Sequence, residues 1–301
     1  MIFILAVVGI LGVSASGPIM AATMAPALTI ALWRNVFGAL VLGAPTAISS
    51  PGFLKSLTRS ELKYTAIAAT ALAFHFACFV TSVKMTTVAA ATALVCLQAA
   101  WIALFQWLQG SKPPRPVLMG LGTAMVGVVV ITGFDMGVSR EALVGDLLAL
   151  VGGILAAIYT MAGSKARKSL SIGVYSSLCY GICSLILLAL CLVFRQPLVN
   201  IPPEAWWGIV GVTVAAQLFG HTIFNYLLAT ISPLVVSMMI LLEIPGAAIM
   251  AGVFLSQQLP PGTYAGLGLI LAGLAMVVLR QGRSGIKKRQ GRSGIKKGIK
   301  K

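Results

Sequence analysis

The chain consists of long apolar runs separated by short turns that carry charges, prolines or other polar residues. A helix that spans a bilayer needs about 20 mostly apolar residues. Ten runs of that length can be read along the chain, at residues 2–20, 27–48, 62–83, 87–109, 116–134, 144–164, 172–194, 205–226, 233–255 and 261–279. The pattern therefore predicts an all-α integral membrane protein with ten transmembrane helices.

Composition narrows the class further. The 301 residues are 58% hydrophobic and 9% charged, whereas a soluble protein carries about a quarter charged residues. The formal charge is +16, but 10 of the 22 Lys and Arg residues lie in residues 280–301, which we interpret as a basic, disordered cytoplasmic tail. The apolar body offers no basic groove, so no nucleic-acid partner is expected. The expected partners are the lipid bilayer and a small-molecule substrate, and the chain is expected to act as a monomer.

Lys and Arg residues of the short loops fall unequally on the two sides of the predicted bundle. Cytoplasmic loops carry an excess of these residues. With the N-terminus inside, the inside loops hold Lys55, Arg59, Lys63, Lys112, Arg115, Lys165, Arg167 and Lys168, and the outside loops hold Lys84, Arg140 and Arg195. Both termini are therefore predicted to be cytoplasmic.

A glycine motif occurs twice, once in each half of the chain. Gly120-Leu121-Gly122 is followed by Gly127, and 146 residues later Gly266-Leu267-Gly268 is followed by Gly273. Each copy follows a proline-bearing turn and lies in the last predicted helix of its half. Five helices per half is an odd number, so the second half must cross the membrane in the opposite direction.

The predicted architecture is therefore a 5+5 inverted repeat. Residues 1–138 form the first five-helix repeat, and residues 139–279 form the second, inverted one. Inverted repeats place a substrate site near the midplane between the halves, and they permit alternating access by rocking one half against the other.

The chain resembles the drug/metabolite transporter superfamily, in particular its EamA-type exporters. The resemblance is carried by Leu242-Glu243-Ile244-Pro245, by Phe254-Leu255-Ser256-Gln257, and by Gly266 and Gly273. Within the family the chain is similar to bacterial aromatic amino-acid exporters, which implies a multi-pass protein of the bacterial inner membrane. It departs from the family pattern at Ser111 and Gln257, where members usually have glutamate, and at Ala100, the position paired with Pro245.

Polar and aromatic residues inside the predicted spans are candidates for substrate binding, because polar groups at bilayer depth are costly. Gln217, His221 and Asn225 follow one another at intervals of four residues and share a helix face. They could line a cavity or join neighbouring helices. His75 and His221 are 146 residues apart, the offset of the glycine motif. The predicted substrate-binding set is His75, Phe79, Gln98, Trp101, Tyr159, Gln217, His221 and Asn225.

Glu243 is the one carboxylate deep within a predicted span, and it precedes Pro245 by two residues. A proline inside a helix removes a backbone donor and kinks the helix. The carboxylate could carry a proton, pair with a substrate ammonium, or form a structural ion pair with Arg34. Arg34 lies a third of the way into its span, so we expect it to extend its guanidinium to the outer interface.

The function expected from these features is secondary transport. The chain has no P-loop that would bind ATP, and its five cysteines form no metal-ligand pattern, so neither a cofactor nor a metal is expected. Residues 12–17 fail the GxSxG pattern of a serine hydrolase, because Ser16 stands at the last glycine, so an enzyme within the membrane is a remote alternative. The aromatic candidates favour export of aromatic amino acids, with a multidrug or nucleobase/nucleoside exporter as the alternative.

Overall fold

A computed structural model describes residues 2–111, 114–135, 139–258, 262, 264–273 and 276. Every regular element in these ranges is a helix. The predicted tail, residues 280–301, lies outside the described residues, as do Lys112, Pro113 and the proline-bearing turn at 259–261.

The helices follow the ten predicted spans, which confirms the all-helical membrane fold. The first half comprises α1 (Ile2–Ser14), α2 (Ser16–Ala22), α3 (Ala27–Ser49), a short α4 (Phe53–Ser56), α5 (Arg59–Met85), α6 (Val88–Val95), α7 (Gln98–Leu108) and α8 (Arg115–Asp135). The second half comprises α9 (Arg140–Ala166), α10 (Ile172–Val193), α11 (Pro203–Val212), the π-helix η1 (Thr213–Thr222), α12 (Ile223–Leu227), α13 (Pro233–Ile240) and α14 (Glu243–Leu255). Eight of the described spans are long and apolar enough to cross a membrane, and two shorter apolar helices, Arg115–Val130 and Tyr264–Gly273, complete the set.

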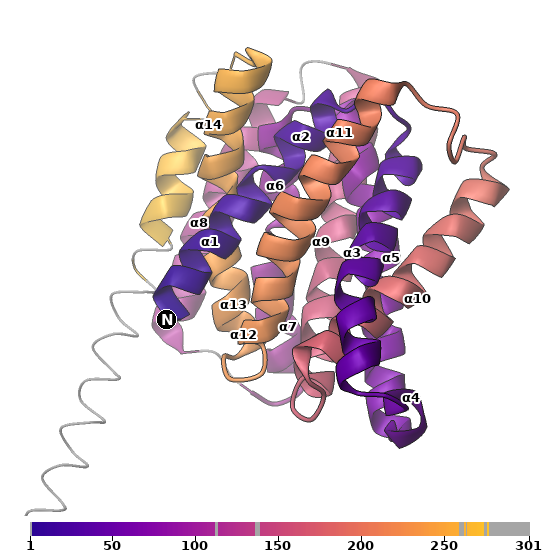
Figure 1. The fold of residues 1–301 in the computed structure, drawn as a ribbon. Helices are drawn as coiled ribbons and strands as arrows, with labels where there is room; N and C mark the ends of the chain where they lie inside the picture. Colours follow the sequence, from indigo (N-terminus) through magenta and orange to yellow (C-terminus); the bar gives the residue numbers. More distant parts are fainter. Residues whose placement is uncertain are drawn as a thin grey trace, which may run out of the picture.

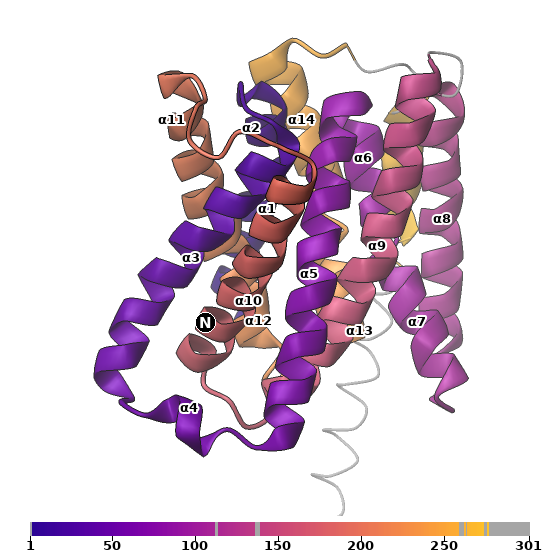
Figure 2. The ribbon, with the colours of Figure 1, turned by 90° about the vertical axis from the view of Figure 1, so that its right-hand side faces the viewer.

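The two halves run through the bundle in opposite directions. In Figure 1 α1 rises from the N-terminus to α2 at the top of the bundle. In Figure 2 α9, the first helix of the second half, starts at the top beside the end of α8 and descends. The end of the bundle where α1 begins is called the N-terminal side below, and the opposite end is called the far side.

The repeated glycine motif lies where the last helices of the two halves meet. A Cβ atom added to Gly127 would lie 2.6 Å from the carbonyl oxygen of Gly266, and one added to Gly273 would lie 2.4 Å from that of Gly120. Real Cβ atoms do not approach a backbone so closely, so the two helices can meet here only because glycine has no side chain. The two contacts are reciprocal, as the inverted repeat requires.

The fourth and ninth spans are each interrupted near their middle. Helix α6 ends at Val95 and α7 starts at Gln98, while α13 ends at Ile240 and α14 starts at Glu243. In both interruptions the backbone tightens to i→i−3 bonds, from Leu97 N to Leu94 O (3.2 Å) and from Leu242 N to Met239 O (3.2 Å). The second interruption precedes Pro245, where the sequence predicts a kink, whereas the first has Ala100 at the paired position and was not predicted.

Candidate functional site

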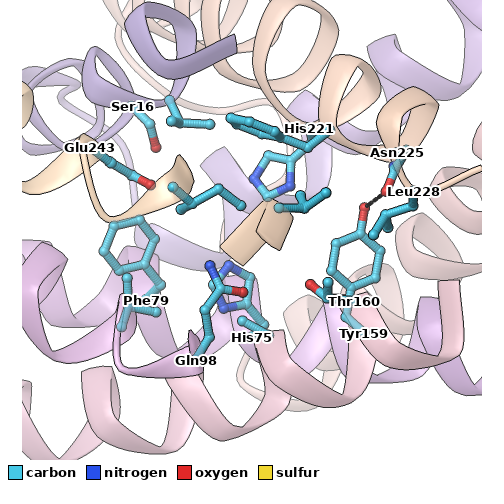
Figure 3. A pocket seen from close by; sticks show the side chains of 16 residues that line it. Ser16, His75, Phe79, Gln98, Tyr159, Thr160, His221, Asn225, Leu228 and Glu243 are labelled. Atoms are coloured by element: carbon cyan, nitrogen blue, oxygen red, sulfur yellow. Dashed lines mark hydrogen bonds between the residues drawn. The ribbon is translucent and has the colours of Figure 1, made fainter. Parts of the chain in front are cut away.

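A cavity lies at the centre of the bundle, between the two interrupted spans (Figure 3). Its volume is about 40 Å³, whereas pockets that hold small ligands measure about 300–1,000 Å³. The cavity is therefore contracted in this structure, and a metabolite could occupy it only after the surrounding helices move. Its polar and aromatic lining comes from both halves: Ser16, His75, Phe79 and Gln98 from the first, and Tyr159, Thr160, His221, Phe224, Asn225 and Glu243 from the second.

The lining residues are related by the internal repeat. His75 and Phe79 are displaced by 146 residues from His221 and Asn225, and Val95 and Gln98 are displaced by 145 residues from Ile240 and Glu243. All eight residues line the cavity. The cavity thus lies on the pseudo-two-fold axis between the halves, which is where inverted repeats place a substrate site.

The two histidines face one another across this axis. Their ring centroids are 6.4 Å apart and their planes are inclined by 61°. The Nδ1 atom of His75 lies 3.0 Å from the carbonyl oxygen of Gly152. A carbonyl can only accept a hydrogen bond, so Nδ1 carries the proton and Nε2 of the neutral ring is an acceptor. His75 also stacks on Phe79, with ring centroids 5.8 Å apart.

Gln98 and Glu243 are the first residues of the two half-helices that start at the cavity, α7 and α14. Both side chains are buried, and neither makes a hydrogen bond to another described residue. A helix N-terminus carries a partial positive charge, so each half-helix can stabilise an anionic group beside it. The two ends differ in chemistry, because one presents an amide and the other a carboxyl group.

Tyr159 and Asn225 form one rigid wall of the cavity. The hydroxyl of Tyr159 donates to Oδ1 of Asn225 at 2.7 Å, which is drawn as a dashed line in Figure 3. Asn225 Nδ2 lies 3.4 Å from the hydroxyl oxygen of Tyr180, which is 3.1 Å from Oγ1 of Thr222. Thr222 donates its own proton to the carbonyl of Gln217 at 2.8 Å, so Tyr180 is the donor in its bond with Thr222. Each of these residues thus donates a hydrogen bond to the next one, in a series that starts at Tyr159 in the cavity wall and ends at the carbonyl of Gln217.

Arg34 does not reach the membrane interface, so the sequence-based expectation is wrong. The side chain is fully buried, and its Nε donates to Oε1 of Gln217 at 2.9 Å. The guanidinium carbon lies 4.2 Å from the centre of the Phe76 ring, a distance typical of a cation–π contact. No ion pair joins Arg34 to Glu243, although both residues are described. The guanidinium is held inside the bundle by a partner from another helix, which a local sequence pattern does not reveal.

Two members of the predicted set lie outside the cavity. Gln217 binds Arg34 and donates from Nε2 to Oδ1 of Asn35 at 3.0 Å, so it belongs to a buried network beside the cavity. Trp101 packs against the main core. The other six predicted residues, His75, Phe79, Gln98, Tyr159, His221 and Asn225, line the cavity together with Glu243.

Thr160 and Arg167 are among the residues with a part in the site that were not predicted. Thr160 lines the cavity beside Tyr159. Arg167, counted in the sequence as a loop cation, is buried, and its Nε donates to the carbonyl oxygen of Asn225 at 3.0 Å. Burial lowers the pKa of its guanidinium from the ordinary value. The polar pair Tyr159–Thr160 in an apolar run could have signalled Thr160, but no sequence feature separates Arg167 from the exposed loop cations.

The packing around the cavity differs between the N-terminal side and the far side. On the N-terminal side a hollow of about 510 Å³ lies below the cavity and shares Leu228 with it. On the far side α2 lies against the start of α6, because a Cβ atom on Gly17 would be 2.8 Å from Cγ1 of Val88. Val88 forms a dry cluster there with Ala247 and Ala251. The far side is therefore closely packed, whereas on the N-terminal side buried Leu228 lines both the cavity and the open hollow.

Within the described part of the chain, no group of three or more His, Cys, Asp or Glu side chains is placed to hold a metal ion. The chemistry that the site offers is therefore that of imidazole, amide, hydroxyl and carboxyl groups with aromatic rings.

Comparison with known proteins yields a family match, a related sequence and a similar solved structure. Residues 143–279 match the profile of the EamA-like transporter family. An uncharacterized transporter of Archaeoglobus fulgidus is 25% identical over 206 residues, which is 66% of this chain and 70% of the relative. A solved crystal structure aligns with a TM-score of 0.71 at 16% identity, covering 92% of this chain and 97% of that one, and it supports the fold alone.

Proposed function

We propose that this chain, a transporter of the drug/metabolite (EamA) type, is a secondary transporter that exports amino acids, with aromatic amino acids favoured. In the proposed mechanism the central cavity is exposed to one side of the membrane at a time. One observation carries the proposal: a polar cavity lies on the pseudo-two-fold axis of two inverted halves, at the point where the fourth and ninth spans are both interrupted.

The lining fits an amphiphile with an amine, a carboxylate and a planar side chain. The carboxylate of Glu243 can pair with the ammonium group of the substrate. The amide of Gln98 can donate a hydrogen bond to the substrate carboxylate. The N-terminus of α7 favours the same group, because it carries a partial positive charge. Phe79, His75 and Tyr159 offer ring faces and edges on which an aromatic side chain can pack.

Glu243 is also the group that can couple export to protons. A bare carboxylate is unfavourable in a dry cavity, so it must be neutralised by a bound proton or by a bound ammonium. The two cannot occupy the same carboxylate together. A proton that arrives from one side therefore releases the substrate, and a substrate that arrives from the other releases the proton, which gives antiport.

The asymmetry of the two ends is consistent with alternating access. The far side is closed by Val88, Ala247 and Ala251, while on the N-terminal side Leu228 alone is shared between the cavity and the hollow outside it. Because the halves are inverted copies, exchanging their conformations would close the N-terminal side and open the far side.

The membrane and its orientation follow from the loop charges. The described residues of the N-terminal side include Lys55, Arg59, Lys63, Arg115, Lys165, Arg167 and Lys168, against Lys84, Arg140 and Arg195 on the far side. We infer from this excess that the N-terminal side faces the cytoplasm, and the resemblance to bacterial exporters supports the inner membrane of a bacterium. The hollow below Leu228 then faces the cytoplasm, as loading of an exporter requires.

Counterflow in proteoliposomes tests the proposal. Vesicles loaded with unlabelled phenylalanine should accumulate labelled phenylalanine transiently when they contain the protein, and liposomes without it should not. Unlabelled tryptophan should compete, whereas a sugar phosphate should not. Counterflow of a nucleoside or of a cationic drug in place of every amino acid would contradict the substrate class, and no counterflow of any solute would contradict secondary transport.

A further inference from the structure

The hollow on the N-terminal side is open to that side. It measures about 510 Å³ and is walled by the ends of α7 and α9 and by the turn between α12 and α13. We call it the vestibule and define it by Gln106, Gln109, Lys165, Lys168, Thr230 and Ser232. It shares Leu228 with the central cavity, and Leu228 is buried. The vestibule is thus adjacent to the cavity, and Leu228 lies between the two.

The vestibule carries positive charge and no compensating acid among its described lining residues. Lys165 lies in the last turn of α9 and Lys168 in the turn that follows it, and both line the vestibule and are exposed. The ammonium of Lys165 lies 5.0 Å from the centre of the ring of Tyr64, a residue outside the vestibule lining. The other lining residues named above are neutral hydrogen-bonding groups.

Fewer positive charges lie at the far side. They are Lys84, Arg140 and Arg195, and the ammonium of Lys84 donates to the backbone oxygens of Thr23 and Ala21 at the end of α2. Positive charge is therefore denser at the N-terminal side, the end at which an exporter collects its substrate.

From this geometry we propose that the vestibule is an access site that binds the carboxylate of the transported solute before Leu228 moves aside. The inference rests on the proposed function and deepens it, because it restricts the substrates to amphiphiles that carry an anionic group. Simple cationic amines, which Glu243 alone would accept, are disfavoured by the two lysines.

Exposed charges of this kind act on capture rather than on the later steps. They raise the local concentration of an anion, and the effect is screened by salt, with a Debye length of about 8 Å at physiological ionic strength. Neutralising both lysines should therefore raise KM for loading from the N-terminal side, while kcat stays the same.

The test compares the double variant Lys165→Gln/Lys168→Gln with the matched control Lys55→Gln/Lys63→Gln. The control removes two lysines from the same side, neither of which lines the vestibule. Uptake of labelled phenylalanine is measured into vesicles in which the N-terminal side faces outward, at low salt and again in excess KCl. Labelled phenethylamine, which lacks the carboxylate, is the second probe.

The vestibule variant should show a KM for phenylalanine about 3–10-fold above the control at low salt, and the difference should vanish in excess KCl. Its KM for phenethylamine should fall or stay the same. The single variant Lys168→Gln should give a smaller shift of the same sign, which guards against misfolding of the double variant. An equal KM for phenylalanine in both double variants, with wild-type transport intact, overturns this inference alone. Wild-type transport of phenethylamine without phenylalanine, or of neither, overturns the proposed function and this inference with it.

Discussion

The fourth span (α6–α7) and the ninth span (α13–α14) share one interrupted backbone geometry but present different side chains to the cavity. Both are interrupted at equivalent positions, and both second half-helices start at the cavity. One starts with Gln98 and has Ala100 two residues on, while the other starts with Glu243 and has Pro245 two residues on. The backbone geometry is shared by the two halves, and the charge is not.

This difference shows what the interruption does not depend on. The α6–α7 interruption forms without a proline, so a proline is not required to interrupt the helix. Helix α9 packs closely there, because a Cβ on Gly153 would lie 2.9 Å from the carbonyl oxygen of Val95. Pro245 falls in the first turn of α14, where its missing N–H is tolerated. We infer that packing between helices sets the interruption, and we propose that Glu243 makes one end specific for cations.

The largest expected effect comes from removing the charge difference. Glu243→Gln makes both half-helices start with an amide, so neither a proton nor an ammonium can be exchanged at the carboxyl group. Proton-driven export and counterflow of phenylalanine should both fall by more than about 100-fold, or about 2.7 kcal/mol. Gradient-driven flux in proteoliposomes measures this effect.

Gln98→Glu is the matched control for that variant, because it adds a carboxylate at the paired position and keeps Glu243. Its new carboxylate repels the substrate carboxylate that Gln98 receives, so KM for phenylalanine should rise, while the flux that remains should still be driven by the proton gradient. Flux that persists unchanged in Glu243→Gln would rule out Glu243 as the coupling group.

The glycine contacts are a place where the two halves should behave alike. Gly127→Leu and Gly273→Leu each force a side chain into the backbone of the facing helix, so each should lower the free energy of unfolding by about 2 kcal/mol. Gly122→Leu and Gly268→Leu should cost less, because a Cβ at either site meets nothing within 4 Å. Denaturant unfolding in mixed micelles measures all four, and a large difference between the first two would contradict the reciprocal contact.

A smaller and unequal effect is expected at the two histidines. His75→Phe removes the bond to the carbonyl of Gly152, so it should cost about 1 kcal/mol of stability. His221 makes ring contacts with Phe76 and Tyr159 but no hydrogen bond to a described residue, so His221→Phe should cost less. Thermal unfolding of the purified variants checks the order, and a greater loss for His221→Phe would reverse the assignment.

The smallest effect is expected for Pro245→Ala, which makes the ninth span like the fourth at this position. The interruption should persist, and counterflow should stay within about twofold of wild type, or about 0.4 kcal/mol. Loss of counterflow in a folded Pro245→Ala protein would show that proline, rather than packing, sets the interruption.

The sequence predicted the architecture well because two simple constraints determine it. Backbone polar groups in lipid must be satisfied within helices, so apolar runs translate directly into spans. The spacing of Gly120 and Gly127, repeated at Gly266 and Gly273, marks the helix pair that must approach closely. Polar residues in apolar runs, such as His75, Gln98 and Glu243, stand out for the same reason.

The failures have two physical origins, a partner on another helix and an unexpected helix type. Arg34 was expected at the interface, but Gln217 and Phe76 hold it inside. Gln217 was expected to share a face with His221 and Asn225, yet residues 213–222 form a π-helix, whose wider turn changes which side chains line up. The local sequence pattern reveals neither the partner nor the helix type.

The central claim is that the cavity between the interrupted spans is exposed to each side of the membrane in turn, and thiol labelling at Thr160→Cys, which lines the cavity, tests it most directly. The five native cysteines are first replaced, and the variant must retain counterflow. A membrane-impermeant thiol reagent is then added from either side of oriented vesicles, with and without phenylalanine. The account predicts labelling from both sides, with phenylalanine and an imposed proton gradient shifting the two rates in opposite directions. Labelling from one side alone under every condition would contradict alternating access through this cavity.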